Sequence, residues 1–445
     1  MMDSAARRYA GLSVPRYTSY PTAADFTPLV AGKDLARWLG RLDATEPVSI
    51  YLHVPYCREL CFYCGCNTKM ALRDSVVLSY RDALIAEIAL VSGLLKAPLR
   101  VSRLHWGGGT PSILGAEGLR RVVDELERHV SFERDLEHAI ELDPRYVTVE
   151  LSDGSAALGV TRASLGVQDI NPLVQAAIGR VQPLGMIEAA VDRLRGAGIK
   201  KLSFDLMYGL PLQTPKSIRT TCAAVSALAP DRISCFGYAH LPRLKANQRQ
   251  IDEAKLPGLD QRIKQAELIE AELVRHGYAK IGIDHFARPG DSLAFAAASG
   301  RLHRNFQGYT DDDRATLLGF GASSISTLAD GYVQNVADVP RYVSTVASGM
   351  LATIRGCRLS ADDRRRAQII ERLMCEFEVD LAEIAPGVDF GEELAMLQPM
   401  QQQGLLTRRG TTLALTEIGR PVARVVAAAF DTYRRPPSRQ FSTAI

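Results

Sequence analysis

Residues 49–67 of the chain read SIYLHVPYCRELCFYCGCN. The apolar and aromatic residues at the start of this stretch predict a buried β-strand over 48–54. Cys57, Cys61 and Cys64 follow the strand with the spacing CxxxCxxC. Closing loops this short costs little entropy, so one compact turn can bring three thiolates together. The stretch therefore predicts a strand that carries a metal or metal-cluster loop at its C-terminal end.

The same strand is the first of a series that extends from about residue 47 to 285. Helical stretches separate the strand-like runs, as where Val77, Tyr80, Leu84 and Ile88 recur at helical spacing. This alternation predicts right-handed βαβ units and a parallel sheet, either doubly wound or closed into a full or partial barrel. The expected strands are 48–54, 101–106, 139–142, 161–167, 201–206, 233–238 and 278–284.

Glycines and polar residues follow several of these strands. Residues 106–111 read WGGGTP, and Glu141, Gln168 and Asp205 each end a later strand. Ligands of such sheets bind at the C-terminal ends of the strands. Glycines let backbone groups approach a ligand closely, and carboxylates or amides accept hydrogen bonds from its hydroxyl or amino groups. The same residues also suit tight turns and helix caps, so both interpretations stay open.

The cysteine pattern favours an iron–sulfur cluster. A complete ferredoxin-type site uses four cysteine ligands, whereas three would leave one iron with an open position, as in catalytic metal sites. The alternative is a zinc knuckle, which typically needs a second CxxC or a histidine pair at set spacing. Neither follows Cys66 before Cys222. The four scattered cysteines are interpreted as small buried hydrophobic residues.

Composition excludes several classes of protein. The 445 residues carry 53 Lys and Arg against 50 Asp and Glu, and 47% of them are hydrophobic. This near-balance argues against a dedicated nucleic-acid or membrane-surface protein. Glu87 and Arg424 interrupt the longest apolar stretches, so no membrane-spanning segment is expected, and no signal peptide follows Arg7 and Arg8. We expect a cytoplasmic protein with no nucleic-acid or membrane partner.

The two ends fall outside the strand–helix alternation. Residues 1–35 show no strong periodicity and predict an extended N-terminal arm. From about residue 355 the pattern is mostly helical, and its last part suggests helix, hairpin and helix, a winged-helix-like order. Such a domain can bind DNA, but acidic residues such as Glu371, Glu376 and Asp380 favour a capping role.

These motifs resemble those of a known enzyme family. CxxxCxxC after the first strand of an α/β domain resembles the radical S-adenosylmethionine (SAM) superfamily. The longer string, YLHVPYCRELCFYCGCN, resembles the oxygen-independent coproporphyrinogen III oxidases. One residue departs from the family pattern: Tyr63, between the second and third cysteines, stands where the family usually has phenylalanine. Further similar segments occur in the same order from about residue 16 to at least 375. They are RYTSYPTA, HWGGGTPS, ELDPR, SLGVQD, FDLMYGLP, GYAHLP, IDHFA and LHRNFQGYT.

The resemblance implies an anaerobic oxidative decarboxylation. Two propionate side chains of coproporphyrinogen III would become vinyl groups, giving protoporphyrinogen IX in porphyrin and haem biosynthesis. It implies a 4Fe-4S cluster held by Cys57, Cys61 and Cys64, with SAM on the open iron. A 5′-deoxyadenosyl radical would abstract hydrogen from the β-carbon of each propionate. It further implies two SAM molecules, an unidentified electron donor and acceptor, and a monomer.

The resemblance also assigns roles to single residues. Catalytic roles fall to Tyr51, His53 and Cys66, and Cys66 is expected near the second SAM rather than on the cluster. By themselves, Ala239 and Ile325 look like ordinary packing residues. The cofactor-binding positions are Tyr51, Tyr63, Gly108, Gly109, Thr110, Glu141, Gln168, Arg180, Asp205, Ala239, Phe306, Gln307 and Ile325.

The expected architecture is a partial (β/α) barrel of the radical SAM type in four parts. These are an arm (1–35), a catalytic barrel (36–300), a segment covering substrate and SAM (301–354) and a mostly helical, winged-helix-like C-terminal domain (355–445). The first alternative function is a related haem chaperone, although such relatives typically lack the CGCN cysteine, the RYTSYPTA arm and the HRNFQGYT segment. The second is an iron–sulfur winged-helix regulator, which would need a basic recognition helix.

Overall fold

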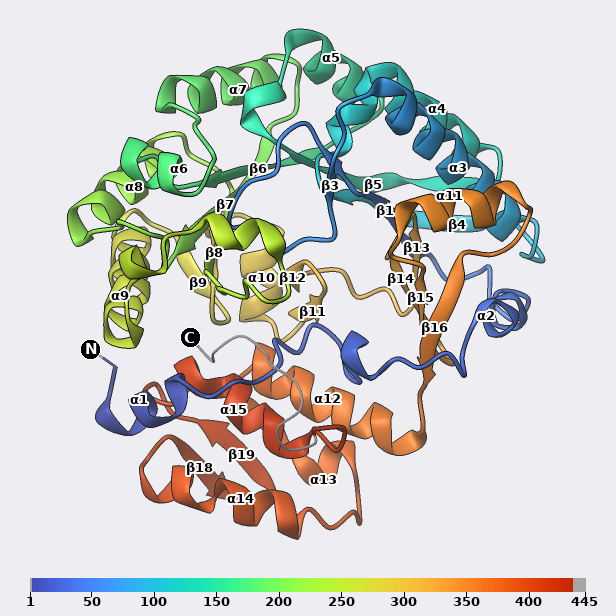
Figure 1. Ribbon diagram of the computed structural model, residues 1–445. Coiled ribbons are helices and arrows are strands. Elements are labelled where there is room, and N and C mark those ends of the chain that lie inside the picture. The colour runs from blue at the N-terminus through green and yellow to red at the C-terminus, as the bar shows by residue number, and fades with distance from the viewer. Residues whose placement is uncertain (1, 435–445) are drawn as a thin grey trace.

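One sheet of twelve strands organises the molecule in a computed structural model that describes residues 2–434 (Figure 1). Its central strands pair in parallel, and their curvature gives a partial barrel. In spatial order they are β13 (Leu317–Phe320), β1 (Val48–Val54), β4 (Leu99–Gly108), β5 (Val130–Leu142), β6 (Arg162–Gln168), β7 (Lys201–Tyr208) and β8 (Arg232–Gly237).

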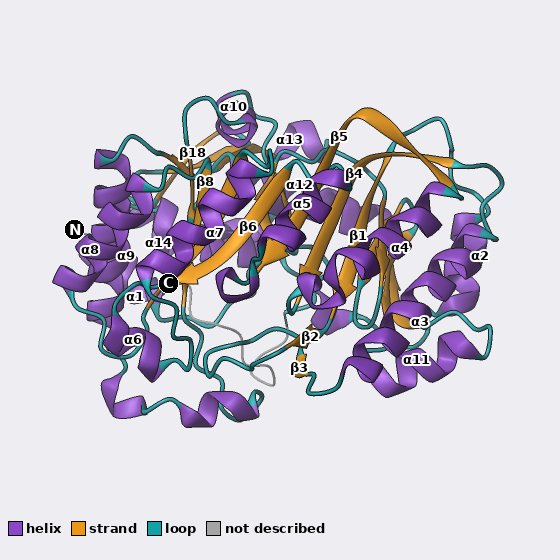
Figure 2. Cartoon of the chain, turned by 90° about the horizontal axis from the view of Figure 1, so that it is seen from above, coloured by secondary structure: helices purple, strands orange, loops and turns teal. Residues whose placement is uncertain are grey.

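Helices form an arc around the outside of these strands (Figures 1 and 2). Three of them, α5, α6 and α8, begin at a capping side chain; α8, for example, follows Thr214, whose hydroxyl accepts from the amide of Ser217. The expected helical stretches are confirmed. The covering helices are α3 (Asp74–Ser92), α4 (Gly115–Glu127), α5 (Val149–Ala157), α6 (Pro172–Ala177), α7 (Leu184–Gly196), α8 (Pro215–Ala227) and α9 (Leu259–Arg275).

The two faces of the barrel strands differ in chemistry. In β1, Ile50 and Leu52 join the apolar core under the helices, whereas Tyr51 and His53 point the other way and bond to each other. Strand residues alternate between faces, so one face is apolar and the other polar. The polar face lines the inside of the barrel, where the site lies.

Antiparallel strands extend the sheet at both edges. The expected strand over 278–284 is wrong, because Gly282 turns the chain with φ +59°. Two short strands form instead, β9 (Ala279–Ile281) and β10 (His285–Ala287); β10 pairs antiparallel with both β8 and β9. At the other edge the 301–354 segment contributes to the sheet. Its strands there are β13, β14 (Ile325–Leu328), β15 (Gly331–Asn335) and the start of β16 (Thr353–Arg358).

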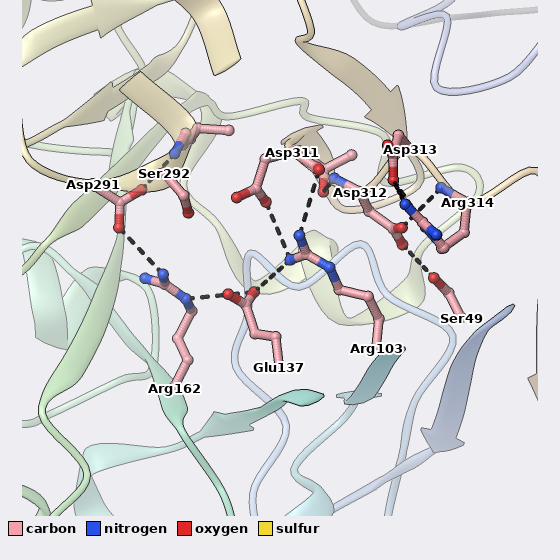
Figure 3. A network of polar contacts seen from close by, with 12 residues as sticks. Ser49, Arg103, Glu137, Arg162, Asp291, Ser292, Asp311, Asp312, Asp313 and Arg314 are labelled. Atoms are coloured by element: carbon pink, nitrogen blue, oxygen red, sulfur yellow. Dashed lines mark hydrogen bonds and ion pairs between the residues drawn. The ribbon is translucent and has the colours of Figure 1, made fainter. Parts of the chain in front are cut away.

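An ion-pair network closes the barrel at the N-terminal ends of its strands (Figure 3). Arg103 of β4 pairs with Glu137 of β5 at 3.0 Å and with Asp311 at 3.2 Å. Arg162 of β6 pairs with Asp291 at 3.2 Å and lies 3.7 Å from Glu137. Asp291, before α10, and Asp311, after β12, thus pair with the arginines at this end of the strands, and the opposite end is left for ligands.

The N-terminal arm is not wholly extended, contrary to expectation. It forms α1 (Ser4–Ala10), the 3-10 turn η1 (Ala23–Asp25) and the start of α2 (Gly32–Leu39). Ala6, Tyr17 and Tyr20 are buried in the apolar core of the C-terminal domain. Tertiary packing therefore stabilises a helix of seven residues that has little periodicity of its own.

The C-terminal domain lies beneath the barrel, with the arm between the two (Figure 1). It has the expected helices and hairpin, and a third strand joins the hairpin in a small sheet of order β17-β19-β18. Its elements are α12 (Ala361–Cys375), β17 (Glu378–Asp380), α13 (Leu381–Ile384), α14 (Gly391–Gln402), β18 (Leu406–Arg409), β19 (Thr412–Leu415), η6 (Arg420–Val422), α15 (Ala423–Ala427) and η7 (Ala428–Phe430).

Short elements complete the fold. None of the helices within residues 2–434 has the length and apolar character needed to cross a bilayer. The remaining elements are β2 (Tyr56–Cys57), β3 (Lys69–Met70), η2 (Pro111–Leu114), η3 (Pro144–Tyr146), η4 (Ala246–Gln250), η5 (Glu253–Lys255), α10 (Ser292–Ala298), β11 (His303–Asn305), β12 (Gly308–Thr310) and α11 (Val339–Ala347).

Candidate active site

The cysteine loop leaves β1 and is closed at its base by the short parallel pair of β2 and β3. The amide of Lys69 donates to the carbonyl of Pro55 at 2.8 Å, and that of Ala71 donates to the carbonyl of Cys57 at 2.9 Å. Both ends of the loop are thereby held at the C-terminal edge of the sheet. The expectation that the cysteines follow the first strand in one compact turn is confirmed.

Asn247 of η4 holds the middle of the loop. Its side-chain amide donates to the carbonyl oxygens of Cys61, Phe62 and Cys64 at 3.0, 3.1 and 2.9 Å. The amide of Gln248 donates to the carbonyl of Tyr63 at 2.8 Å. Two adjacent amide side chains thus order the backbone that carries the cysteines, a role that no sequence motif announced.

A cavity of about 640 Å³ opens at the C-terminal ends of the strands, beside this loop. It brings together most of the residues singled out in the sequence, from seven different segments of the chain. Those lining it are Cys57, Cys61, Tyr63, Cys64, Cys66, Gly108, Gly109, Thr110, Glu141, Gln168, Arg180, Asp205 and Ala239.

The thiols in this cavity have polar partners. Cys57 Sγ lies 3.4 Å from the hydroxyls of both Thr68 and Thr110, and Cys61 Sγ lies 3.4 Å from Nη1 of Arg180. A hydrogen bond from the neighbouring Cys66 lowers the pKa of Cys64, and this same pairing raises the pKa of Cys66. Burial raises the pKa of Cys57 although the hydrogen bonds to Thr110 and Thr68 lower it, so this thiol would give up its proton on binding metal, which needs the thiolate.

The donor set fits a cluster held by three cysteines. Thiolates are soft ligands that suit iron–sulfur clusters and zinc. Across the described part of the chain, no group of three His, Cys, Asp or Glu side chains surrounds the position of a single metal ion. A cluster offers a separate iron to each cysteine, so it suits three thiols spread around one cavity. Cys66 is exposed, and no described cysteine forms a disulfide.

Two carboxyl groups at the strand ends differ in charge. Burial works to raise the pKa of Glu141, but hydrogen bonds from His105 and from the amide of Gly108 outweigh it and hold the pKa below its usual range. Burial and the charge of Glu141 raise the pKa of Asp205 to about 7, although the Ser164 hydroxyl donates to it at 3.3 Å. The cavity therefore holds one firmly ionised carboxylate and one that titrates near neutral pH.

Arg180 is held from several sides. Its guanidinium pairs with Asp143 at 3.1 Å and donates to the carbonyl of Gly166 at 2.8 Å. Asp143 also caps η3 and pairs with Arg145. Gln168 ends β6 with a left-handed backbone, φ +64°, at a shift in register against β7. Such a strained conformation at a strand end is typical of functional sites.

The glycine turn after β4 packs directly against the cysteine loop. Gly108 has φ +114°, and a Cβ there would lie 2.7 Å from the His53 ring. A Cβ on Gly109 would lie 2.6 Å from both Thr68 Oγ1 and the carbonyl oxygen of Tyr56. Only glycine lets the two loops approach this closely, which explains the GGG run in physical terms.

The chain is similar to known proteins over most of its length. Residues 51–225 match the Radical SAM superfamily and residues 359–422 match the HemN C-terminal domain. The oxygen-independent coproporphyrinogen III oxidase of Bradyrhizobium diazoefficiens is 43% identical over 450 residues, covering 100% of both chains. That of Escherichia coli K12 is 40% identical over 441 residues, covering 97% of this chain and 96% of the relative. The chain belongs to the oxygen-independent coproporphyrinogen III oxidase family.

A solved structure supports the fold of this family member. The coproporphyrinogen III oxidase (HemN) of Escherichia coli, described as a radical SAM enzyme, superimposes with a TM-score of 0.90 at 38% identity. The match covers 95% of this chain and 100% of that chain. The radical SAM partial barrel with an arm and a mostly helical C-terminal domain, expected from the sequence, is therefore confirmed.

The remaining family positions do not line the main cavity. Tyr51 and His53 lie beneath it, with 2.9 Å between the Tyr51 hydroxyl and His53 Nδ1, and burial lowers the pKa of His53. The Phe306 ring packs edge-on against Tyr51 with centroids 4.4 Å apart. Phe306 and Ile325 line a separate cavity of about 510 Å³ next to the arm. Tyr51 thus connects the cysteine side of this oxidase fold with the second cavity.

Gln307 is another family position that does not line the main cavity. Its side-chain nitrogen is buried and has no hydrogen-bond partner among residues 2–434. A buried amide donor without a partner costs free energy, so such a group commonly serves a ligand. Sequence reasoning placed Gln307 near a cofactor only through the family motif HRNFQGYT, because one glutamine carries no spacing signal.

Proposed function

We propose that the chain catalyses the anaerobic oxidative decarboxylation of coproporphyrinogen III to protoporphyrinogen IX in porphyrin and haem biosynthesis. Two propionate side chains would each lose the β-hydrogen, one electron and carbon dioxide and become vinyl groups. The observation that carries the proposal is the cavity in which three cysteines, a glycine turn and two unlike carboxyl groups meet. Membership of the coproporphyrinogen III oxidase family over the full chain length supports the choice of substrate.

Cys57, Cys61 and Cys64 would hold a 4Fe-4S cluster, and the cavity beside them would hold SAM. When bound, these cofactors supply the one-electron cleavage and the carbon-centred radical that removes the propionate hydrogen. The Thr110 hydroxyl donates to Cys57 Sγ, the Thr68 hydroxyl contacts the same sulfur, and the Arg180 guanidinium donates to Cys61 Sγ. These groups would stabilise the cysteine ligands and leave the fourth iron of the cluster open to SAM.

The chain's own polar groups would orient SAM. Ionised Glu141 suits the cationic ammonium group, and Gln168 and Asp205 at the next strand ends suit the ribose hydroxyls. The glycine turn lines the cavity without side chains that would keep a ligand away, and Ala239 lines it as well. Apolar and aromatic walls exclude water from the region where a reactive radical forms.

A second SAM molecule is proposed in the region of Tyr63, Phe306 and Gln307, and Ile325 is proposed as a further nucleotide-binding position. The unpartnered amide of Gln307 and the second cavity beside Phe306 support this placement. Tyr51, His53 and Cys66 are proposed as the catalytic residues between the two regions. We further propose that the protein works as a cytoplasmic monomer and takes part in electron exchange with a separate donor and acceptor.

The test is a single-enzyme reaction under strictly anaerobic conditions. The reconstituted protein is incubated with a low-potential reductant, SAM and coproporphyrinogen III, and vinyl products and released carbon dioxide are measured. We expect two carbon dioxide molecules for each protoporphyrinogen IX. Tight haem binding with no vinyl product would support the haem chaperone instead, and salt-dependent DNA binding would support a regulator.

A further inference from the structure

A network of polar groups crosses the apolar layer between α3 and the sheet, where α3 lies next to α11 (Figure 1). Glu87 of α3 is 2% exposed, and one of its carboxylate oxygens accepts from the Gly321 amide and the Tyr342 hydroxyl, both at 2.7 Å. The side-chain amide of Asn335 donates to the other oxygen. Burial raises the pKa of Glu87 to about 7, so this carboxyl group is costly to bury. A buried network whose groups all have partners makes the structure around it rigid.

Glu87 holds the turn between β13 and β14, residues 321–324, which we call the Gly321 turn. The Gly321 backbone has φ +98°, and a Cβ there would lie 2.4 Å from the carbonyl oxygen of His53. The Ser324 hydroxyl and the Asn335 side-chain amide donate to the Gly321 carbonyl at 2.7 and 3.0 Å. Because only glycine lets the turn come this close to the end of β1, the turn packs directly on the backbone of His53.

Tyr80 of α3 joins the same turn to His53. Tyr80 is fully buried, and its hydroxyl donates to the His53 carbonyl at 2.7 Å and accepts from the Ala322 amide at 2.9 Å. Its ring lies 5.3 Å from that of Tyr342, centroid to centroid. Tyr80 and Glu87 are two turns of helix apart, so both reach the Gly321 turn from one face of α3.

The turn also reaches the His53 ring. Ser323 has a left-handed backbone, φ +67°, and its hydroxyl lies 3.4 Å from Nε2 of His53. The Asn67 carbonyl oxygen lies 3.2 Å from the same nitrogen. A carbonyl oxygen can only accept, so Nε2 carries the proton of the neutral ring and Nδ1 accepts from the Tyr51 hydroxyl. A strained residue beside this ring is typical of a functional site.

We propose that Tyr80 and Glu87 are positioning residues that hold the His53 ring in place through the Gly321 turn. The ring then keeps its bonds to Tyr51 on one side and to the backbone just after Cys66 on the other. It thus lies between the other two residues proposed as catalytic. The value of this position for catalysis rests on the proposed function, whereas the hold on the ring is a property of the chain alone.

The first test measures how well the His53 ring is protected in the full-length chain before cofactors are added. Diethyl pyrocarbonate acylates neutral imidazole rings, and mass spectrometry of the peptides gives the rate at each histidine. We expect Tyr80→Phe to raise the rate at His53 by about fivefold or more. The reason is that the His53 carbonyl and the Ala322 amide lose the hydroxyl that joins them.

Two controls separate this effect from a general loosening of the fold. His138 is 1% exposed with both ring nitrogens bonded, so its acylation rate in the same sample is the internal reference. Tyr278→Phe is the matched variant, because it also removes a buried hydroxyl, one that donates to the Pro230 carbonyl at 2.8 Å. It should leave the rate at His53 unchanged.

A second variant tests Glu87 itself. Glu87→Ala should expose His53 as Tyr80→Phe does, and Glu87→Gln should do so less, because a glutamine oxygen can still accept from the Gly321 amide. Thermal melting checks folding. If Glu87→Ala does not fold, Ser323→Gly replaces it, since glycine suits the left-handed backbone and removes the hydroxyl beside His53. Ala229→Gly, at φ +55° before β8, is the control for the change in backbone strain.

Steady-state turnover of the reconstituted enzyme then tests the catalytic consequence. Displacing His53 should lower kcat for vinyl formation by about tenfold or more and leave KM for the porphyrinogen nearly unchanged. Wild-type protection of His53 in Tyr80→Phe and in the second variant would overturn the proposal, as would an equal rise at His53 and His138. An unchanged kcat in variants that expose His53 would also overturn it. Protection of His53 in a wild type that forms no vinyl product contradicts only the proposed function.

Discussion

Glu141 and Asp205 show how position within one cavity sets the charge of a residue. Both end parallel strands, yet two hydrogen-bond donors keep Glu141 ionised whereas burial beside Glu141 raises the pKa of Asp205 to about 7. A cationic ligand between them would favour ionisation of both. The site is therefore poised to gain negative charge when SAM binds.

The raised pKa of Asp205 predicts that the stability of the protein depends on pH. Folding raises the Asp205 pKa from 3.8 to about 7, so the folded state holds the proton more tightly than the unfolded state. The contribution of this group to the free energy of unfolding therefore falls as the pH rises from about 4 to about 7, and stays low above that. In Asp205→Asn the SAM-free protein should lose less stability between pH 5.5 and 8, as measured by thermal melting. Asp153→Asn, on the exposed side of α5, is the control; an unchanged pH profile in Asp205→Asn would contradict the assignment.

The cysteines should separate into ligands and a non-ligand. Changing Cys57, Cys61 or Cys64 to alanine should abolish the cluster, because two thiolates cannot hold it securely. Cys66→Ser should keep iron, sulfide and the spectral change on adding SAM, yet lose most vinyl product. Iron and sulfide content, the EPR spectrum with and without SAM and product formation are measured on each preparation. Loss of iron from Cys66→Ser would make Cys66 a ligand.

Among the elements, the cysteine loop depends on a 3-10 turn that lies far away in the sequence. Asn247 bonds to three carbonyl oxygens of the loop, so the loop geometry is set by η4 as well as by β1. Side chains that hold a metal-binding loop in place help the protein to retain its metal cluster, although they are not ligands themselves. The loop and η4 therefore form one structural unit.

Asn247→Ala should weaken this unit without removing a ligand. Loss of buried hydrogen bonds costs about 1–3 kcal/mol, so the variant should assemble a cluster but release iron to a chelator several times faster. Chelator-induced bleaching of the cluster absorbance measures the rate. Gln250→Ala, exposed in the same turn, is the control, and equal rates in both variants would count against a role for Asn247.

At the scale of the whole molecule, the arm connects the barrel to the C-terminal domain. The Tyr17 hydroxyl donates to Asp431 at 2.9 Å, and the Tyr20 hydroxyl lies 2.9 Å from that of Thr432. Arg304 of the barrel segment donates to arm carbonyls from the other side. The arm is thus held by both neighbours, and it carries Arg16 to the edge of the main cavity.

Tyr17→Phe should loosen the arm while leaving the cluster site intact. The change leaves the half-buried carboxylate of Asp431 without this donor, at a cost of about 1–3 kcal/mol. Trypsin should then cleave faster at Arg7, Arg8 or Arg16, which limited proteolysis with mass spectrometry detects. Tyr9→Phe in α1 of the same arm is the control. Cleavage at the wild-type rate would show that the hydrogen bond does not restrain the arm.

The sequence by itself determined the features that depend on local order. Alternating apolar residues predicted six of the barrel strands and the helices between them, because strand and helix periods are short. CxxxCxxC predicted the cysteine loop, because its loops are too short to place the thiols elsewhere. The family resemblance selected Gln307 and Ile325 as expected cofactor-binding positions, which no local pattern would have selected.

Tertiary structure alone decided the features built from distant segments. The strand β13 joins β1 from more than two hundred residues away, Asn247 reaches the cysteine loop, and Arg103, Glu137 and Asp311 close the barrel. None of these segments carries a sequence motif that announces the contact. Each contact forms because the chain folds back and brings the two segments together. A local pattern carries no information about the path of the chain through space.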